Sequence, residues 1–343
     1  MKRKTILGIL ITSVLIIAAL ALGPAKSLFQ QHGKSVDITE NYSAGNTVTT
    51  LQFDADSAYA FTAAQCDFGP RNMNSDGHDK CKKWIINKFR SYGCEVMSQD
   101  ADLRGYDGTM LKSSNIIARH RTDINRRIML CAHWDSRPWA DNDPDPDNWH
   151  KPILAANDAA SGVAVMIEIA RLLQNDTTLN VGIDFVCFDA EDWGTPQWEE
   201  NQQGSSESWA LGAQYFAQNM PLPITPQYAI LLDMVGGESA TFYREMFSLK
   251  YARDVVDRIW TASREVGQSS FFVYEDGGAI TDDHIPLNTI ARIPTADIIP
   301  YHPNCRESSF GATWHTIADN MDNISRNTLK AVGQTVLQVL AKE

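Results

Sequence analysis

The sequence is poor in the features that mark nucleic-acid-binding, metal-finger and coiled-coil proteins. No Lys- and Arg-rich run follows the first four residues, and the 343-residue chain has a formal net charge of −12, so nucleic acid is not an expected partner. The six cysteines are not spaced as metal-binding pairs, which argues against a finger. The sequence has no internal repeat and no heptad pattern, and we therefore expect a monomer.

The N-terminus joins positive charge to an apolar run. MKRK precedes the apolar residues 6–23, a pattern typical of a signal peptide or of a single membrane anchor. No cysteine follows the run, so a lipoprotein anchor is not expected. Either alternative predicts that the rest of the chain is exported, into the periplasm, anchored facing it, or secreted. We divide the chain into this leader (1–25), a polar spacer (26–50) and a folded domain (51–343).

Export permits disulfide bonds. Cys66 and Cys81 flank the turn sequence FGPRNMNSDGHD and are the pair that we predict to be bridged. Cys131 and Cys187 lie in apolar, strand-like runs and are expected to be buried thiols.

The domain alternates between short apolar runs and segments with helical periodicity. Such alternation predicts an α/β fold, a single mixed, largely parallel sheet flanked by helices on both faces. The expected strands include 127–133, 181–188, 228–234 and 294–299, and the expected helices include 161–173, 210–218, 251–266 and 325–342. Two long loops, around 136–156 and 194–208, interrupt the pattern, and loops of this length inside a compact domain are usually functional.

The apolar strand that begins at Val181 ends in a group of acids, Asp189, Glu191 and Asp192. Neighbouring side chains on an extended segment point to opposite sides, so Glu191 and Asp192 are suited to different tasks. One can hold a metal while the other moves protons. Taken alone, the pair is more simply explained as a solvated acidic loop.

Polar residues also follow the other expected strands. Singly, each has an ordinary structural explanation, such as a buried histidine, a helix cap or a turn former. Together, a scattered set of histidines and carboxylates is typical of a catalytic metal site with an open coordination position. The set comprises His133, Asp135, Asp158, Glu191, Asp192, Asp233, residues 282–284 and His315.

Six motifs in a fixed order carry a family resemblance. They are AHWDS, AANDAASGVAVMIEIARLL, FVCFDAEDWG, LLDMVG, DDHIP and WHTIADNMDNI. In this order they resemble the zinc aminopeptidase clan, and within it most of all the animal-type glutaminyl cyclases, which also occur in bacteria. The resemblance covers roughly residues 55–342. It implies that the folded domain is a zinc-dependent catalytic domain of the zinc-aminopeptidase-like architecture.

The resemblance leaves the number of metal ions open. Aminopeptidases of the clan bind two zinc ions, and the cyclases keep similar residues but bind one zinc ion, through the positions of Asp158, Asp192 and His315. The positions in this chain that match all five aminopeptidase ligands are His133, Asp158, Asp192, Asp233 and His315.

Three features favour the cyclases over the aminopeptidases. The insertion after Asp192 is long and carries Trp193 and Trp198, as it does in the cyclases. Asp282 stands where many aminopeptidases have serine, and Trp314 precedes the metal-binding histidine where they often have tyrosine. The chain departs from the animal cyclases at Asp297, where they have histidine, and in the acidity of the 136–156 loop.

The resemblance implies an enzyme that converts the N-terminal glutamine of peptides or proteins into pyroglutamate and releases ammonia. Zinc would polarise the γ-amide, and Glu191 would carry a proton from the α-ammonium to the leaving nitrogen. Asp233 and Asp282 would form a carboxylate network beside Glu191. Trp314, with Trp193 or Trp198, would wall a small substrate pocket.

The alternative is a zinc-dependent aminopeptidase with two metal ions. In that enzyme Glu191 would activate a water molecule, and His133 and Asp233 would complete the second metal site.

Overall fold

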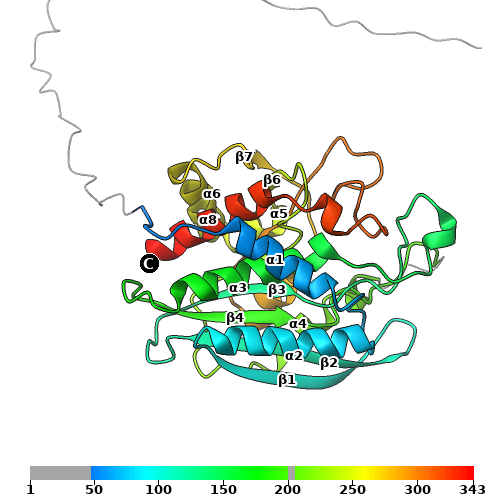
Figure 1. Cartoon of the computed structure of the whole chain (residues 1–343), viewed down its shortest axis with the longest axis horizontal. Coiled ribbons are helices and arrows are strands. Elements are labelled where there is room, and N and C mark those ends of the chain that lie inside the picture. The colour runs from blue at the N-terminus through cyan, green and yellow to red at the C-terminus, as the bar shows by residue number, and fades with distance from the viewer. Residues whose placement is uncertain (1–47, 200–204) are drawn as a thin grey trace, which may run out of the picture. The chain divides into compact units, whose positions relative to one another are not determined.

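A mixed six-stranded sheet forms the centre of the computed structural model, which describes residues 48–199 and 205–343 (Figure 1). The first two neighbouring pairs in the spatial order are antiparallel and the last three are parallel. This arrangement confirms the predicted mixed, largely parallel sheet. In spatial order the strands are β1 (Glu95–Arg104), β2 (Met110–His120), β4 (Gly182–Phe188), β3 (Arg127–His133), β5 (Ala229–Leu232) and β8 (Thr295–Ile298).

A second, two-stranded sheet was not predicted. It pairs β6 (Phe242–Arg244) with β7 (Phe272–Asp276) in parallel. The sequence predicts a short strand over 271–274, and β7 confirms it with bounds shifted by one or two residues. The three-residue strand β6 was not predicted, because it is too short to produce a periodic signal.

Every residue of β3 is buried, because side chains on both of its faces pack into a hydrophobic core. Ile128, Leu130 and Ala132 face one core, and Met129 and Cys131 face the other. The strand therefore appears in the sequence as a continuous apolar run rather than as an alternation.

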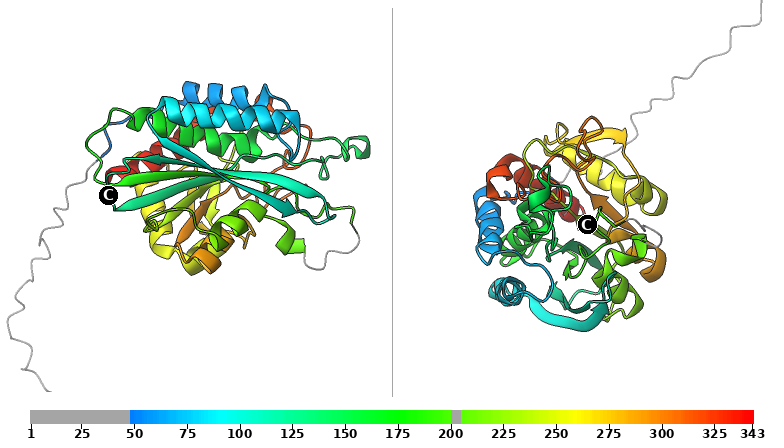
Figure 2. Two further views of the ribbon diagram at one scale, coloured as in Figure 1. Left: turned by 90° about the horizontal axis from the view of Figure 1, so that it is seen from below. Right: turned by 90° about the vertical axis from the view of Figure 1, so that its right-hand side faces the viewer.

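Helices cover both faces of the sheet, as predicted (Figure 2). One core is shared by α1 (Ala55–Cys66), α2 (Asp76–Ser91), α3 (Gly162–Leu173), α6 (Arg253–Glu265) and α8 (Arg326–Ala341). The other core contains α4 (Leu211–Gln218) and the turn Leu287–Ala291. Two short helices, α5 (Met246–Tyr251) and α7 (His284–Pro286), complete the α-helices of the described residues.

Helix α3 lies directly against the sheet at its first residue. A Cβ atom on Gly162 would lie 2.1 Å from the Leu232 carbonyl oxygen and 2.9 Å from Ala132 Cβ. Only glycine allows this close approach, which places the turn before α3 beside the ends of β3 and β5.

A buried ion pair joins β3 to β4 at the beginning of β3, the end opposite His133. Arg127 donates to Asp184 through Nη2 at 2.7 Å and through Nε at 2.8 Å, and both side chains are fully buried. Its remaining donors bind carbonyl oxygens of the surrounding chain, among them those of His120 and Ile183. Asp184, the polar interruption in the apolar run of β4, is thus satisfied within the structure.

The predicted Cys66–Cys81 disulfide is wrong, because both residues are free thiols. Cys66 ends α1 and Cys81 lies inside α2, and each is buried in the hydrophobic core. Burial raises the pKa of the Cys81 thiol to about 12, so at neutral pH this thiol is protonated and unreactive. Cys131 and Cys187 are buried free thiols, as expected.

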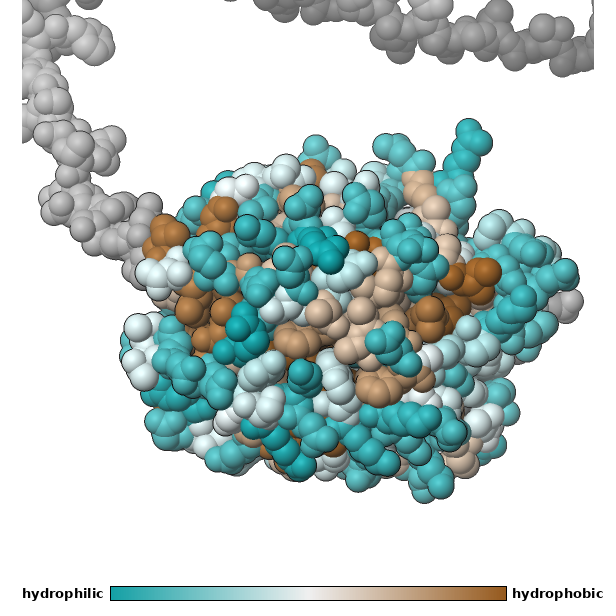
Figure 3. All heavy atoms as spheres, in the orientation of Figure 1, coloured by the Kyte–Doolittle hydropathy of each residue, from teal (hydrophilic) through white to brown (hydrophobic). Residues whose placement is uncertain are grey.

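The predicted leader (1–25), including the apolar residues 6–23, lies outside the described residues, as does most of the spacer (26–50). In the part of the chain that the structure describes, no helix is both long and apolar enough to cross a membrane. On the face shown in Figure 3, hydrophobic residues lie in separate patches among hydrophilic ones.

Candidate active site

The strands β3, β4 and β5 end at the same edge of the sheet, and polar residues follow each of them. β3 lies between β4 and β5. The strand that follows β3 in the chain, β4, pairs with one side of it, and the next strand of the sheet, β5, pairs with the other side. Open α/β sheets place their sites at such a switch point, outside the carboxyl ends of the strands. His133 ends β3, Asp192 lies in the loop after β4, and Asp233 follows β5.

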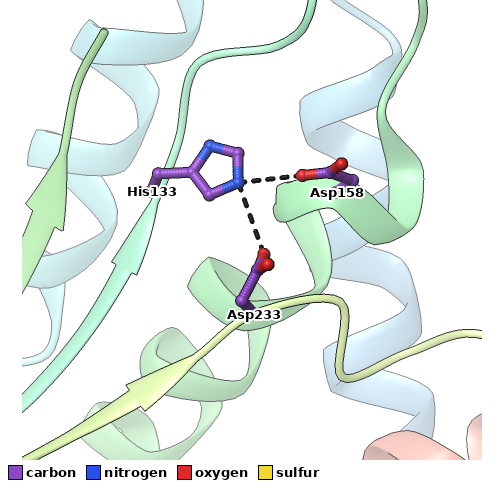
Figure 4. A group of neighbouring side chains, drawn as sticks. All are labelled: His133, Asp158 and Asp233. Carbon is purple, nitrogen blue, oxygen red and sulfur yellow. Dashed lines mark hydrogen bonds and ion pairs between the residues drawn. The ribbon is translucent and has the colours of Figure 1, made fainter. Parts of the chain in front are cut away.

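His133, Asp158 and Asp233 form the first of two joined clusters (Figure 4). His133 Nε2 lies 2.9 Å from Asp158 Oδ1 and 3.3 Å from Asp233 Oδ1. All three side chains are buried, and burial opposes a charge on the imidazole. The carboxylates outweigh burial, so that the pKa of His133 is raised well above its usual value.

The second cluster consists of Asp158, Asp192 and His315. His315 Nε2 lies 3.4 Å from Asp192 Oδ1 and 3.7 Å from Asp158 Oδ2. Asp158 thus belongs to both clusters, which is the arrangement that a bridging carboxylate needs between two metal positions.

The chemistry of both clusters fits zinc. Each offers one imidazole and two carboxylates, ligands that zinc accepts in catalytic sites. Among the described residues, the buried oxygen Asp192 Oδ2 has no hydrogen-bond partner, and Asp233 Oδ1 is paired with His133 Nε2 at 3.3 Å without the geometry of a hydrogen bond. A buried carboxylate oxygen without a partner is unfavourable unless a cation or a proton satisfies it. Burial accordingly raises the pKa of Asp192, with His315 opposing the shift.

Asp158 is not a helix cap, the ordinary alternative for this residue. It lies in the turn Ala156–Ser161 with non-helical backbone angles, and its peptide bond to Ala159 is cis. Asp319 accepts hydrogen bonds from the backbone N–H groups of Asn157 at 2.7 Å and Asp158 at 3.1 Å. Burial opposes the charge of Asp158, but His133 and His315 outweigh it and lower the pKa of this carboxyl.

Asp135 fixes the loop that carries Glu191 and Asp192. Its carboxylate accepts the backbone N–H groups of both residues, each at 3.1 Å. Asp135 Oδ1 also lies 3.4 Å from His133 Nδ1. Asp189, the first acid of the group, has a different task, since it accepts Ser114 N–H and binds the His78 imidazole at 2.9 Å.

Glu191 lies beside the two clusters and belongs to neither. Its side chain is buried, with 7% of the residue exposed. Burial, together with the nearby acids Asp192 and Asp282, raises the pKa of Glu191 well above its usual value, although His133 opposes the shift. A carboxyl group with a raised pKa can both accept and return a proton near neutral pH.

Further buried acids lie near Glu191. Asp282 and Asp283 precede α7, and Asp297 lies in β8. Buried oxygens of all three have no hydrogen-bond partner among the described residues, and burial raises the pKa of each carboxyl. His284 faces Asp297 on one side, at 3.8 Å, and Glu245 on the other, at 3.2 Å. The resulting buried carboxylate network contains Asp282, one of the predicted members, and Asp297, the residue that departs from the animal cyclases.

Of the predicted wall tryptophans, Trp193 and Trp198 both contact Trp139, with ring centroids 5.3 and 5.9 Å away, whereas Trp314 lies beside His315. Trp314 is half-buried and stacks on His315, with ring centroids 3.7 Å apart. Trp198 is half-buried and stacks with Trp149 at 6.3 Å. Trp193 is turned toward a separate cluster that contains Met73 and Leu111, and its indole N–H binds Asp107 at 3.3 Å.

Sequence reasoning missed three residues around the second cluster. Arg137 and Asp141 are buried in the long loop after β3, and Trp209 stacks on His315 with centroids 5.9 Å apart. The length and the acidity of that loop were the available signals, but they do not identify single residues.

The raised pKa values predict how stability depends on pH. In the metal-free chain, burial and neighbouring acids raise the pKa of Asp233 to about 8 and that of Asp319 to about 7. Both lie above the unfolded value of about 4, so the folded state binds more protons between these pH values. Their stabilising effect is complete below about pH 4 and is lost as the pH rises through about 7 to 8.

We therefore expect the melting temperature of the metal-free chain to fall between about pH 5 and pH 8. Asp158 and Asp141, whose pKa values are lowered, titrate below this range and do not offset the effect. Calorimetry in the presence of a chelator measures it, and Asp319→Asn should flatten the curve. A melting temperature that rises over this range would contradict the prediction.

Comparison with known proteins places the chain among zinc peptidases and cyclases. Residues 115–340 match the model of peptidase family M28. The glutaminyl-peptide cyclotransferase of Bos taurus is 27% identical over 259 residues, which cover 67% of this chain and 66% of that protein. The chain thus spans just under two thirds of the length of this curated relative.

Two solved structures are more similar. The glutaminyl cyclase of Bacteroides thetaiotaomicron, bound to N-acetylhistamine, is 49% identical with a TM-score of 0.83, covering 86% of this chain and all of that one. A leucine aminopeptidase precursor from the same organism is 48% identical with a TM-score of 0.82, covering 86% of this chain and 99% of that one. The names of these similar structures thus cover both activities that the motifs suggested.

Proposed function

Since the chain belongs to peptidase family M28 and, within it, to the glutaminyl cyclases, we propose that it is a zinc-assisted glutaminyl-peptide cyclotransferase. It would convert the N-terminal glutamine of peptides or proteins into pyroglutamate. The observation that carries the proposal is the 49% identity over the whole length of a bacterial glutaminyl cyclase. The position of Glu191 beside the second cluster supports it.

Asp158, Asp192 and His315 would hold the zinc ion. When bound there, zinc would supply a Lewis acid for the γ-amide oxygen of the substrate glutamine. One imidazole and two carboxylates leave a coordination position for that oxygen, as catalytic zinc sites require.

Glu191 would carry the proton that the reaction moves. The substrate α-ammonium gives a proton to the Glu191 carboxylate, and the freed amine forms a bond to the γ-amide carbon. The carboxyl then protonates the amide nitrogen, the C–N bond breaks and ammonia leaves. The new ring nitrogen gives up its second proton, which ammonia takes up as ammonium. The raised pKa of Glu191 suits both transfers, because it reduces the free-energy difference between the protonated and ionised forms.

Asp233 and Asp282 would hold Glu191 in a network that shares protons. Burial raises the pKa of both carboxyls, so at least one of the group remains protonated and can donate a hydrogen bond to a neighbouring carboxylate. Trp314 and Trp198 would wall the glutamine pocket. The packing of Trp193 around Asp107 favours a supporting role for this residue.

A two-zinc aminopeptidase is the second candidate, because one observation favours it. His133, Asp158 and Asp233 also form a cluster that can hold a metal ion, with Nε2–Oδ1 distances of 2.9 and 3.3 Å. In that enzyme Glu191 would activate a water molecule between two metal ions.

The two functions are separated by a substrate test. The zinc-loaded chain is incubated with a Gln-initiated peptide and a Leu-initiated peptide of equal length, and the products are identified by mass spectrometry. We expect the Gln peptide to lose one ammonia and the Leu peptide to remain intact. Release of free leucine would refute the cyclase and favour the aminopeptidase.

Export is a further part of the proposal. Residues 1–25, as a signal peptide or a membrane anchor through 6–23, would bring the domain to the periplasm or beyond, where exported peptides are its substrates. Cell fractionation tests this, and a mature chain confined to the cytosol would refute it.

A further inference from the structure

Arg137 and Asp141 form a buried ion pair within the long loop that follows β3. Arg137 donates to Asp141 through Nε at 3.0 Å and through Nη2 at 2.6 Å. Arg137 is fully buried, and Asp141 is 3% exposed. Burying two charges is costly, so a pair of this kind needs further partners to hold it in place.

Those partners are residues of the second cluster. Arg137 Nη1 donates to the Asp192 carbonyl oxygen at 3.1 Å and to the Gly194 carbonyl oxygen at 3.0 Å, and it lies 3.4 Å from Asp192 Oδ1. The guanidinium therefore fixes both the backbone and the carboxylate of Asp192. Its planar fork can do this because its donors point in set directions.

Asp141 reaches the other side of the cluster. Its Oδ1 lies 3.2 Å from His315 Nδ1, a charge contact that is not aligned as a hydrogen bond. If His315 binds a metal ion through Nε2, Nδ1 must carry the proton, and Asp141 is the acceptor beside it. Asp141 Oδ2 also accepts the backbone N–H of Gln197 at 3.0 Å, next to Trp198.

Two tryptophan rings contact the Arg137 guanidinium. The Arg137 guanidinium lies 4.5 Å from the ring centre of Trp209 and 5.2 Å from that of Trp139. Trp209 in turn stacks on His315 at 12° between the ring planes. Arg137 thus contacts Asp192, and Asp141 and Trp209 contact His315.

We propose that Arg137 and Asp141 are positioning residues that fix Asp192 and His315 in the geometry for binding zinc. The proposal rests on the proposed function in taking these two residues as zinc ligands. Through Gln197, the same pair ties the zinc site to the segment that carries Trp198. The long acidic loop would thereby hold two of the predicted zinc ligands in place.

The test measures zinc affinity in the absence of substrate. The full-length chain is freed of metal, and its dissociation constant for zinc is determined by competition with a chromogenic chelator. We expect Asp141→Asn and Arg137→Lys each to weaken zinc binding by about 10- to 100-fold. Asparagine keeps the volume of the carboxylate, and lysine keeps the charge of the guanidinium but loses its fork.

Arg127→Lys is the matched control, because Arg127 forms an equally buried fork with Asp184 at the other end of β3. It should lower the melting temperature and leave zinc affinity unchanged. Substituting cobalt(II) for zinc gives a second measurement, because the visible absorption of bound cobalt depends on the geometry of its ligands. This spectrum should change in Asp141→Asn and stay the same in Arg127→Lys.

Wild-type zinc affinity in both Asp141→Asn and Arg137→Lys would overturn the proposal. The two variants measure the same quantity independently, so either decides the question if the other does not fold. A wild-type chain that binds zinc but leaves a Gln peptide unchanged would refute the cyclase function. That outcome is distinct from a failure of the proposed positioning role.

Discussion

Glu191→Gln should lower kcat for a Gln-initiated peptide by about 10²- to 10⁴-fold, the usual loss when a general acid–base group is removed. Glutamine has nearly the shape of glutamate but cannot accept the proton of the α-ammonium. The leaving nitrogen would then also lack its proton donor. Because Glu191 belongs to none of the groups of described residues that could hold a metal ion, zinc content should stay at the wild-type level.

Steady-state kinetics and zinc analysis of the same preparation test this expectation. Glu168→Gln is a suitable control, since Glu168 is equally buried but lies in α3, where it pairs with Arg171 at 2.6 Å. The control should change stability and leave kcat close to wild type. Full turnover in Glu191→Gln would end the proposed mechanism.

Substitution of a predicted zinc-binding residue should lower zinc content as well as turnover. Asp158→Ala and His315→Ala should each lose both zinc and turnover, because two protein ligands bind zinc far more weakly than three. Asp158 belongs to both clusters, so its loss should also empty a second metal site if one exists. Metal analysis after dialysis, together with peptide turnover, measures both effects.

His133→Ala separates the two functions in the same experiment. A one-zinc cyclase should keep about one zinc ion per chain in this variant, because the other three ligands remain. A two-zinc aminopeptidase should instead lose one of its two metal ions. Retention of full zinc content by Asp158→Ala would show that the metal is bound elsewhere.

The main elements of the fold could be predicted from the sequence because they are buried or strongly periodic. The prediction for β3 matches its observed bounds, and that for β4 differs by one residue, since apolar runs ending in acids identify buried strands that end at a site. The short strand predicted over 271–274 is β7, but β6 was missed because three residues are too few for a periodic signal.

The sequence motifs identified the residues of the second cluster but not the contacts around them. Asp158, Asp192 and His315 were identified by motifs, and the structure brings their side chains together. The acids at the end of the strand include Asp189, but the motifs assign roles only to Glu191 and Asp192, and in the structure Asp189 binds His78 and Ser114 instead of joining a metal cluster.

Sequence patterns indicate which strands are buried, that acids follow them, and which residue types meet at one edge of the sheet. The packing of Trp193 toward Asp107, the free thiols of Cys66 and Cys81 and the partners of His315 are seen only in the folded chain. Burial and periodicity are properties of local segments, and so they leave a trace in the sequence. The contact between Asp141 and His315 joins distant segments, and only the packing of the folded chain brings them within 3.2 Å.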